Sequence, residues 1–188
     1  MIGYAFSGSF CTLAASLKSL EALIERGYEI QPIVSDNVRK TDTRFFLAND
    51  FLEKVQSLCS RRAICTIAEA EPLGPKNPLE ALVVAPCTGN SLAKIANGIT
   101  DTPLTMAVKA HLRADRPLLL ALASNDAMSQ NLSNIARLMT RRSVYFVRMT
   151  EDDPKGKPYS LVAKMSEIPI ALEHALRGEQ MRPIFVEK

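Results

Sequence analysis

Short polar clusters follow four apolar runs of the chain, and their residue types are those that bind anions. The clusters are Ser7-Gly8-Ser9, Ser35-Asp36-Asn37, Thr88-Gly89-Asn90-Ser91 and Ser124-Asn125-Asp126. Hydroxyl and amide groups donate hydrogen bonds to phosphate oxygens, and a Gly lets the backbone approach a ligand closely. The same residues also favour ordinary helix caps and turns. For the third cluster, which follows Pro86, the sequence favours a phosphate-binding strand–turn–helix.

Side chains suited to acid–base or covalent chemistry are scarce. His111 and His174 lie in helical stretches, away from strand ends, which indicates surface or packing roles. Cys11 and Cys87 follow strands, and we interpret both as small buried hydrophobic residues rather than nucleophiles. Asp126 also follows a strand, where a lone carboxylate is equally compatible with a helix cap. No catalytic residue is assigned.

Composition and motifs exclude several classes of protein. The 188 residues are 47% hydrophobic and 23% charged, with a net charge of +3, which is typical of one globular domain and gives no nucleic-acid signature. No apolar run approaches the ~20 residues of a membrane span, and the amino terminus lacks a basic region before its apolar stretch. The four cysteines have no metal-ligand spacing and indicate free thiols, a cytoplasmic protein and no metal site. Neither G-x-G-x-x-G nor a P-loop occurs.

The elements that must position the polar clusters alternate between strand and helix. Apolar runs predict strands at Ile2 to Phe6, Tyr28 to Val34, Leu82 to Ala85, Pro117 to Ala123 and Val144 to Met149, with a weaker one at Ala63 to Ile67. Helical periodicity lies between them, and continuous apolar strands favour a parallel sheet. The prediction is a single doubly wound α/β domain with helices on both faces of the sheet.

Several segments outside these strands have their own predictions. Residues 71–78 hold three Pro and a Gly and predict a loop, and Thr150 to Pro158 predicts a surface loop or flap. Ser160 to Arg177 predicts a closing helix. The domain is expected to cover residues 1–178, with 179–188 as a loosely held C-terminal tail.

The third cluster and its helix resemble a block of the FMN-binding cysteine decarboxylases and their flavoprotein relatives. The block is Pro86-Cys87-Thr88-Gly89-Asn90-Ser91 followed by Lys94-Ile95-Ala96-Asn97-Gly98 and Asp101, and the first cluster is similar to that family's N-terminal G-x-[ST]-G loop. Longer strings, including VSDNVRKTDTRFF, ASNDAM and KPYSLVAKM, are similar to the family of dipicolinate synthase B subunits. That resemblance runs from Ile2 to about Gly178.

The resemblance implies a flavodoxin-like sheet and an FMN site. The residues that would hold the FMN phosphate and ribityl chain are Gly8, Ser9, Ser35, Thr88, Asn90 and Ser91, and those near the flavin ring or its entrance are Ala123, Ser124 and Met128. Lys94 and Asp101 are compatible with helix or trimer contacts. Gly89 replaces an Ala of the family block, which costs little sterically.

The resemblance also implies a function and partners. With an A subunit that resembles an NAD(P)-dependent dehydrogenase, the chain would oxidise a dihydrodipicolinate-type precursor to dipicolinate in the cytoplasm of a sporulating mother cell. Relatives assemble as trimers or multiples of trimers. Arg44 or Arg113 could pair with substrate carboxylates, although exposed arginines are more often solvated.

Two other functions stay open. One is a non-catalytic binding or scaffolding subunit with a vestigial flavin site. The other is a stand-alone FMN-dependent decarboxylase. The decarboxylase is disfavoured because TRFFLANDF, from Thr43 to Phe51, lacks the His that decarboxylating relatives carry early in the chain.

Overall fold

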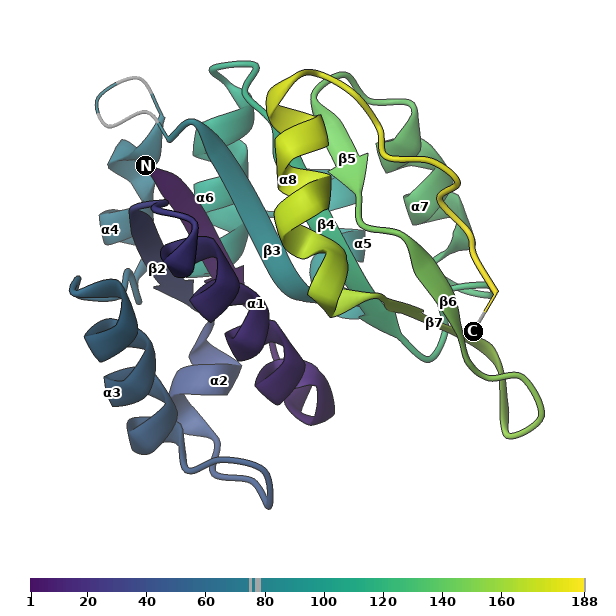
Figure 1. The fold of residues 1–188 in the computed structure, drawn as a ribbon, viewed down its shortest axis with the longest axis horizontal. Coiled ribbons are helices and arrows are strands. Elements are labelled where there is room, and N and C mark those ends of the chain that lie inside the picture. Colours follow the sequence, from purple (N-terminus) through teal and green to yellow (C-terminus); the bar gives the residue numbers. More distant parts are fainter. Residues whose placement is uncertain (75, 77–78, 188) are drawn as a thin grey trace.

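A computed structural model of the chain describes residues 1–74, 76 and 79–187, which form a seven-stranded sheet between two layers of helices (Figure 1). The strand order is β2-β1-β3-β4-β7-β6, and β5 also pairs with β4. The strands are β1 (Ile2–Phe6), β2 (Ile30–Val34), β3 (Ala81–Thr88), β4 (Leu118–Ser124), β5 (Val144–Phe146), β6 (Met149–Asp153) and β7 (Lys157–Ala163). The α-helices are α1 (Leu13–Glu25), α2 (Asp36–Lys40), α3 (Ala48–Cys59), α4 (Ile67–Ala70), α5 (Gly89–Asn97), α6 (Pro103–Leu112), α7 (Leu132–Met139) and α8 (Ile168–Leu176).

The first five strands are parallel and buried on both faces, as their continuous apolar sequences predict. Side chains alternate along each strand between two cores, so Tyr4 and Phe6 face one core while Ala5 faces the other. Helices α1, α3 and α8 cover the first core, and α4, α5, α6 and α7 cover the second (Figure 1). The predicted doubly wound α/β fold is confirmed.

The sheet departs from the prediction at its far edge, where it becomes mixed. Strand β7 runs antiparallel to the end of β4, through the pairs Ala123–Val162 and Ser124–Leu161, and β6 runs antiparallel to β7. The prediction of a loop at 150–158 is therefore wrong, because this segment is a β-hairpin. The prediction of a helix from Ser160 is wrong in its first part, since β7 continues to Ala163 and α8 begins at Ile168.

The hairpin was predicted as a loop because hairpins at the edge of a sheet are polar. Strand β6 is partly exposed and carries three acidic residues. Charged residues protect an edge strand from aggregation, and they also make its sequence resemble that of a loop. Asp153-Pro154-Lys155-Gly156 connects the strands, and it has Asp, Pro and Gly at their preferred type I turn positions. The Gly156 N–H donates to Asp153 Oδ1 at 3.0 Å.

Three smaller predictions also change. The expected strand Val144 to Met149 is two strands, because β5 ends at Phe146 and β6 begins at Met149. The weak strand at Ala63 to Ile67 is reduced to one bridge between Ile33 and Ile64. Within 71–78, Glu71–Leu73 forms a 3-10 helix and Gly74 a turn, while residues 75, 77 and 78 lie outside the described residues.

The segment after Gly178 is held against the sheet edge, so the expectation of a loosely held tail is wrong. The Gln180 side chain accepts from the Phe146 N–H and donates to the Phe146 carbonyl, both at 2.8 Å. Met149 then exchanges backbone hydrogen bonds with Ile184 at 2.8 Å and Val186 at 3.0 Å. The tail therefore anchors the start of the hairpin.

Within the described ranges, every helix is too short or too polar to cross a membrane.

Candidate functional site

The carboxyl ends of the parallel strands form a crevice where the strand order reverses. Strand β1 lies between β2 and β3, and ligands of open α/β sheets bind at such a switch point. A cavity of about 280 Å³ lies here, which we call the switch-point cavity. It is lined by Ser7, Gly8, Ser35, Asp36, Asn37, Thr88, Asn90, Ser91, Lys94, Thr102 and Leu104.

Ser7 joins the ends of β1 and β3. Its hydroxyl donates to the Pro86 carbonyl at 2.7 Å and accepts from the Thr88 N–H at 3.0 Å. The register of β3 against β4 shifts between Val84 and Cys87, where Pro86 has no N–H to give to the ladder. Ser7 therefore compensates for this irregularity and sets the position at which Thr88 leaves the sheet.

Thr88 is the N-cap of α5, so the capping interpretation is correct for this hydroxyl. Thr88 Oγ1 accepts from the Ser91 N–H at 3.2 Å and donates to Ser91 Oγ at 3.0 Å. Because Ser91 Oγ accepts here, its own proton remains available to a ligand. Asn90, between them, is exposed at the cavity.

Ser35 places an unsatisfied hydroxyl in the same cavity. It follows β2 directly, and its Oγ is buried with no hydrogen-bond partner among the described residues. A buried hydroxyl without a partner costs about 1–3 kcal/mol. An anion in the switch-point cavity would remove that cost.

Lys94 places a positive charge at the rim of the switch-point cavity. Its ammonium lies 2.8 and 2.9 Å from the two carboxylate oxygens of Asp101. The hydrogen bond from Lys94 lowers the pKa of the exposed Asp101 carboxyl. The pair joins the end of α5 to the residues before α6, and Lys94 is the cation among the cavity's lining residues.

A second cavity of about 400 Å³ adjoins the first, and we call it the hairpin cavity. It is lined by Ser9, Cys11, Thr12, Ala123, Ser124, Asn125, Asp152, Lys157 and Val162. Ser9 follows Gly8 of the switch-point cavity, and Ala123 pairs in register with Thr88. The two cavities therefore lie on either side of the same strand ends.

Gly89 allows the close packing of a polar cluster behind the two cavities. A Cβ on Gly89 would lie 2.3 Å from Ser124 Oγ and 2.7 Å from both Asn131 Nδ2 and Asp126 Oδ1. Ser124 donates to Asp126, which also accepts from Asn131 Nδ2 at 3.0 Å. The difference from the Ala of the family block is thus a steric requirement of this chain. Asp126 serves this cluster and lines neither cavity.

The structure distributes the site residues expected from sequence over three cavities. Five line the switch-point cavity, namely Gly8, Ser35, Thr88, Asn90 and Ser91, and three line the hairpin cavity, namely Ser9, Ala123 and Ser124. Met128 instead lines a groove of about 560 Å³ with Met149, Leu161, Phe185 and Val186, between the hairpin and the tail. Its N–H donates to the Tyr159 carbonyl at 3.0 Å.

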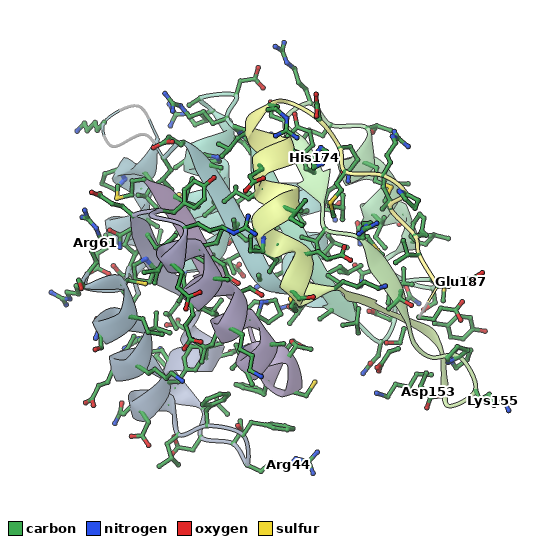
Figure 2. All side chains as sticks on the ribbon, in the orientation of Figure 1. Arg44, Arg61, Asp153, Lys155, His174 and Glu187 are labelled. Carbon is green, nitrogen blue, oxygen red and sulfur yellow. The ribbon has the colours of Figure 1, made fainter. Side chains whose placement is uncertain are left out.

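The two arginines considered for substrate carboxylates line neither cavity. The Arg44 guanidinium stacks over the Phe45 ring at 4.8 Å, and Figure 2 shows its side chain directed away from the body of the protein. Arg113 lines a separate cavity of about 240 Å³ beside α5 and α6. The residues that sequence reasoning missed are Lys157 and Asp152, which the hairpin brings to its cavity.

Cys11 and Cys87 differ in burial. Cys87 is buried, and burial raises the pKa of its thiol to about 12, so the prediction of an inert hydrophobic residue is confirmed. The same prediction is wrong for Cys11, which is exposed and lines the hairpin cavity. The 3-10 helix Phe10–Thr12 turns its side chain outward rather than into the core.

The histidines have structural positions away from both cavities. His111 is buried in α6, where Nε2 contacts the Pro117 carbonyl at 2.8 Å, and burial lowers the pKa of its imidazole. His174 lies at the end of α8 (Figure 2). Its Nδ1 is 3.2 Å from Glu179 Oε2. Both are packing or surface residues, as their helical positions predict.

The donors at the strand ends fit a flavin phosphate. The switch-point cavity offers the unpartnered Ser35 hydroxyl, the remaining proton of Ser91 and the amino end of α5, and a helix amino end attracts anions. The adjoining hairpin cavity provides further room, since ligand pockets typically measure about 300–1,000 Å³.

Comparison with known proteins identifies the family. The model of the family described as "Flavoprotein" matches residues 1–171. The chain belongs to the flavoprotein family. Among curated relatives of this flavoprotein, the B subunit of dipicolinate synthase from Bacillus subtilis (strain 168) is 44% identical over 186 residues, which cover 99% of this chain and 93% of the relative.

Solved structures agree with this assignment. The crystal structure of the B subunit of dipicolinate synthase from Bacillus halodurans C matches with a TM-score of 0.91 and 40% identity, over 100% of this chain and 96% of that one. The FMN-dependent cysteine decarboxylase SpaF matches with a TM-score of 0.66 and 24% identity, over 93% of this chain and 95% of that one. SpaF shares the fold, whereas the two dipicolinate synthase B subunits are also 44% and 40% identical to this chain in sequence.

Proposed function

We propose that this flavoprotein binds FMN across the two adjoining cavities. The observation that carries the proposal is the buried Ser35 hydroxyl, which lacks a partner and lies with Gly8, Asn90 and Ser91 around one cavity. Ser35, Ser91 and the amino end of α5 would hold the phosphate, and the ring would extend past Ser9 and Ala123. Bound FMN would supply a hydride acceptor.

We further propose that the chain is the B subunit of a dipicolinate synthase. In that role it would oxidise a dihydrodipicolinate-type precursor to dipicolinate, together with an A subunit that resembles an NAD(P)-dependent dehydrogenase. The identity to two proteins of that name supports the proposal. Assembly into trimers or their multiples, in the cytoplasm of a sporulating mother cell, belongs to the same proposal.

One observation supports a second candidate, a non-catalytic binding subunit. The ionisable groups that line the two cavities are Asp36, Lys94, Cys11, Asp152 and Lys157, and no histidine lies among these lining residues. The two lysines are both engaged in ion pairs. Such a set orients and binds ligands, and the general base of the reaction would then belong to the partner subunit.

FMN titration of Ser35→Ala tests the cofactor proposal. Loss of one hydrogen bond to a phosphate should weaken FMN binding by about tenfold, because charge-assisted hydrogen bonds contribute about 1.5–3 kcal/mol. Ser19→Ala is the matched control, since the Ser19 hydroxyl is also buried but donates to the Met165 carbonyl at 2.6 Å. Ser19→Ala should reduce stability and leave FMN affinity unchanged. Wild-type protein that is colourless after incubation with excess FMN and removal of the unbound flavin would contradict the proposal.

Reconstitution tests the synthase proposal. Dipicolinate should form when the chain is mixed with NAD(P) and a dehydrogenase-like A subunit, whereas neither protein should form it without the other. Equal formation by the A subunit in the absence of this chain would favour the binding-subunit candidate. Decarboxylation of a peptidyl cysteine by this chain alone would instead favour the decarboxylase.

A further inference from the structure

The hairpin cavity has three walls, and one of them bears a cation. The turn after β1 contributes Ser9, Cys11 and Thr12, the end of β4 contributes Ala123, Ser124 and Asn125, and the β6–β7 hairpin contributes Asp152, Lys157 and Val162. Lys157 is the positively charged residue of this set. We infer that Lys157 binds a carboxylate of the substrate and makes the hairpin a determinant of specificity for small carboxylates.

The strand register places Lys157 over the mouth of the cavity. Val162 and Leu161 pair with Ala123 and Ser124, the last residues of β4. Because β7 runs antiparallel to β4, the residues from Lys157 to Ser160 extend beyond the carboxyl end of that strand. This is the end of the sheet at which the ligand is expected. Lys157 therefore lies on a part of the hairpin that overhangs the site.

Lys157 carries a positive charge at neutral pH, as lysines ordinarily do. Its Nζ lies 2.7 Å from Asp152 Oδ2, and this hydrogen bond and charge raise the pKa of the ammonium group. Cys11, on the facing turn, lines the same cavity. The Lys157 side chain is also half-exposed, so a ligand can reach it without a large rearrangement.

The pairing with Asp152 narrows the class of ligand. A carboxylate of the ligand would bind the Lys157 ammonium, while Asp152 would accept from an N–H or hydroxyl of the same ligand. Two carboxylates at this pair would repel Asp152, so one end of a dicarboxylate is expected here. A small dicarboxylate that carries an N–H or a hydroxyl matches both groups, whereas dipicolinate, which carries neither, offers only its carboxylates to Lys157.

This inference rests on the proposed function, because it takes the hairpin cavity as the substrate end of the flavin site. Calorimetric titration of dipicolinate into the FMN-loaded chain tests it. Lys157→Gln should weaken dipicolinate binding by about tenfold, and Lys157→Arg should retain affinity within about threefold. Lys155→Gln is the matched control, since Lys155 lies at the exposed hairpin turn (Figure 2) outside the cavity, and it should bind as wild type does.

The outcomes separate the two proposals. Lys157→Gln that binds dipicolinate as tightly as wild type, with FMN affinity unchanged, overturns the inference and leaves the cofactor proposal intact. Wild-type protein that binds no dipicolinate also overturns it. If the chain takes up no FMN but binds dipicolinate through Lys157, the cofactor proposal fails and the role of Lys157 stands.

Discussion

The switch-point cavity and the hairpin cavity adjoin at the same strand ends, yet different kinds of structure build them. The first is enclosed by turns that directly follow β1, β2 and β3, so its donors are set by the parallel sheet itself. The second takes one wall from an antiparallel hairpin that the tail holds in place. Neutral hydroxyl and amide groups dominate the first, and a lysine–aspartate pair closes the second.

This difference separates cofactor binding, which is general to the fold, from substrate choice, which is particular to this chain. Turns after parallel strands offer hydroxyl and backbone donors, which suit a phosphate whatever reaction follows. A hairpin at the sheet edge can change its residues without disturbing the switch-point cavity, because β7 forms ladder pairs with β4 at two positions, both at the end of that strand. We therefore expect cofactor affinity to depend on the first cavity and substrate choice on the second.

The largest effect is expected at the anchor of the hairpin. Gln180→Ala removes the side chain that pairs with both the N–H and the carbonyl of buried Phe146, and should lower the free energy of unfolding by about 2 kcal/mol. The tail would detach from β6, and trypsin should then cleave faster after Lys155 in the hairpin turn. Chemical denaturation and limited proteolysis measure the two effects.

Gln180→Glu is the control for that change. It keeps the acceptor for the Phe146 N–H but places a carboxylate oxygen against the Phe146 and Met181 carbonyl oxygens, so its loss of stability should be at least as large as that of Gln180→Ala. A lower free energy of unfolding with no change in hairpin cleavage would show that the tail stabilises the protein without holding the hairpin. That result would contradict the role of Gln180 as an anchor of the hairpin.

An intermediate loss of stability is expected from Gly89→Ala, which changes the packing behind the two cavities. Its Cβ would overlap the Ser124 hydroxyl, and overpacking of this kind costs about 1–3 kcal/mol. FMN affinity should fall as well, since α5 must shift away from β4. Thermal unfolding and FMN titration measure both. Addition of Ser124→Ala removes the nearest clashing atom and should restore part of the stability; the absence of any rescue would contradict the steric explanation.

The first cavity could be predicted from sequence to a greater extent than the second. Ser35 directly follows β2, and Thr88 and Ser91 lie where β3 passes into α5, so local pattern alone places them at one edge of the sheet. Lys157 reaches the site only because β7 pairs antiparallel with β4, a long-range contact that no local period encodes. Its hairpin is polar because it lies at an edge, and that polarity resembles a loop.

The burial and packing of individual residues were harder to predict than the elements that contain them. The sequence predicts that Cys11 and Cys87 both follow strands, but Cys11 lies in an exposed 3-10 turn, whereas Cys87 lies within β3 and is buried. The need for Gly at position 89 depends on Ser124 and Asp126, which are distant in sequence. The Asp153-Pro154-Lys155-Gly156 turn was the one local signal that could have revealed the hairpin.

The smallest effect is expected from Lys94→Gln, and it gives the sharpest comparison of the two cavities because each is lined by one lysine. Lys94→Gln should weaken FMN binding by about threefold, since Lys94 is partly exposed and already paired with Asp101, and such pairs contribute about 0–1 kcal/mol. Its dipicolinate affinity should match that of wild type, whereas Lys157→Gln should show the reverse pattern. Lys109→Gln, an exposed cation on α6 outside both cavities, controls for net charge and should change neither affinity. If either lysine variant weakened the binding of FMN and dipicolinate equally, the two cavities would act as one site. The assignment of cofactor affinity to the switch-point cavity and of substrate choice to the hairpin cavity would then be wrong.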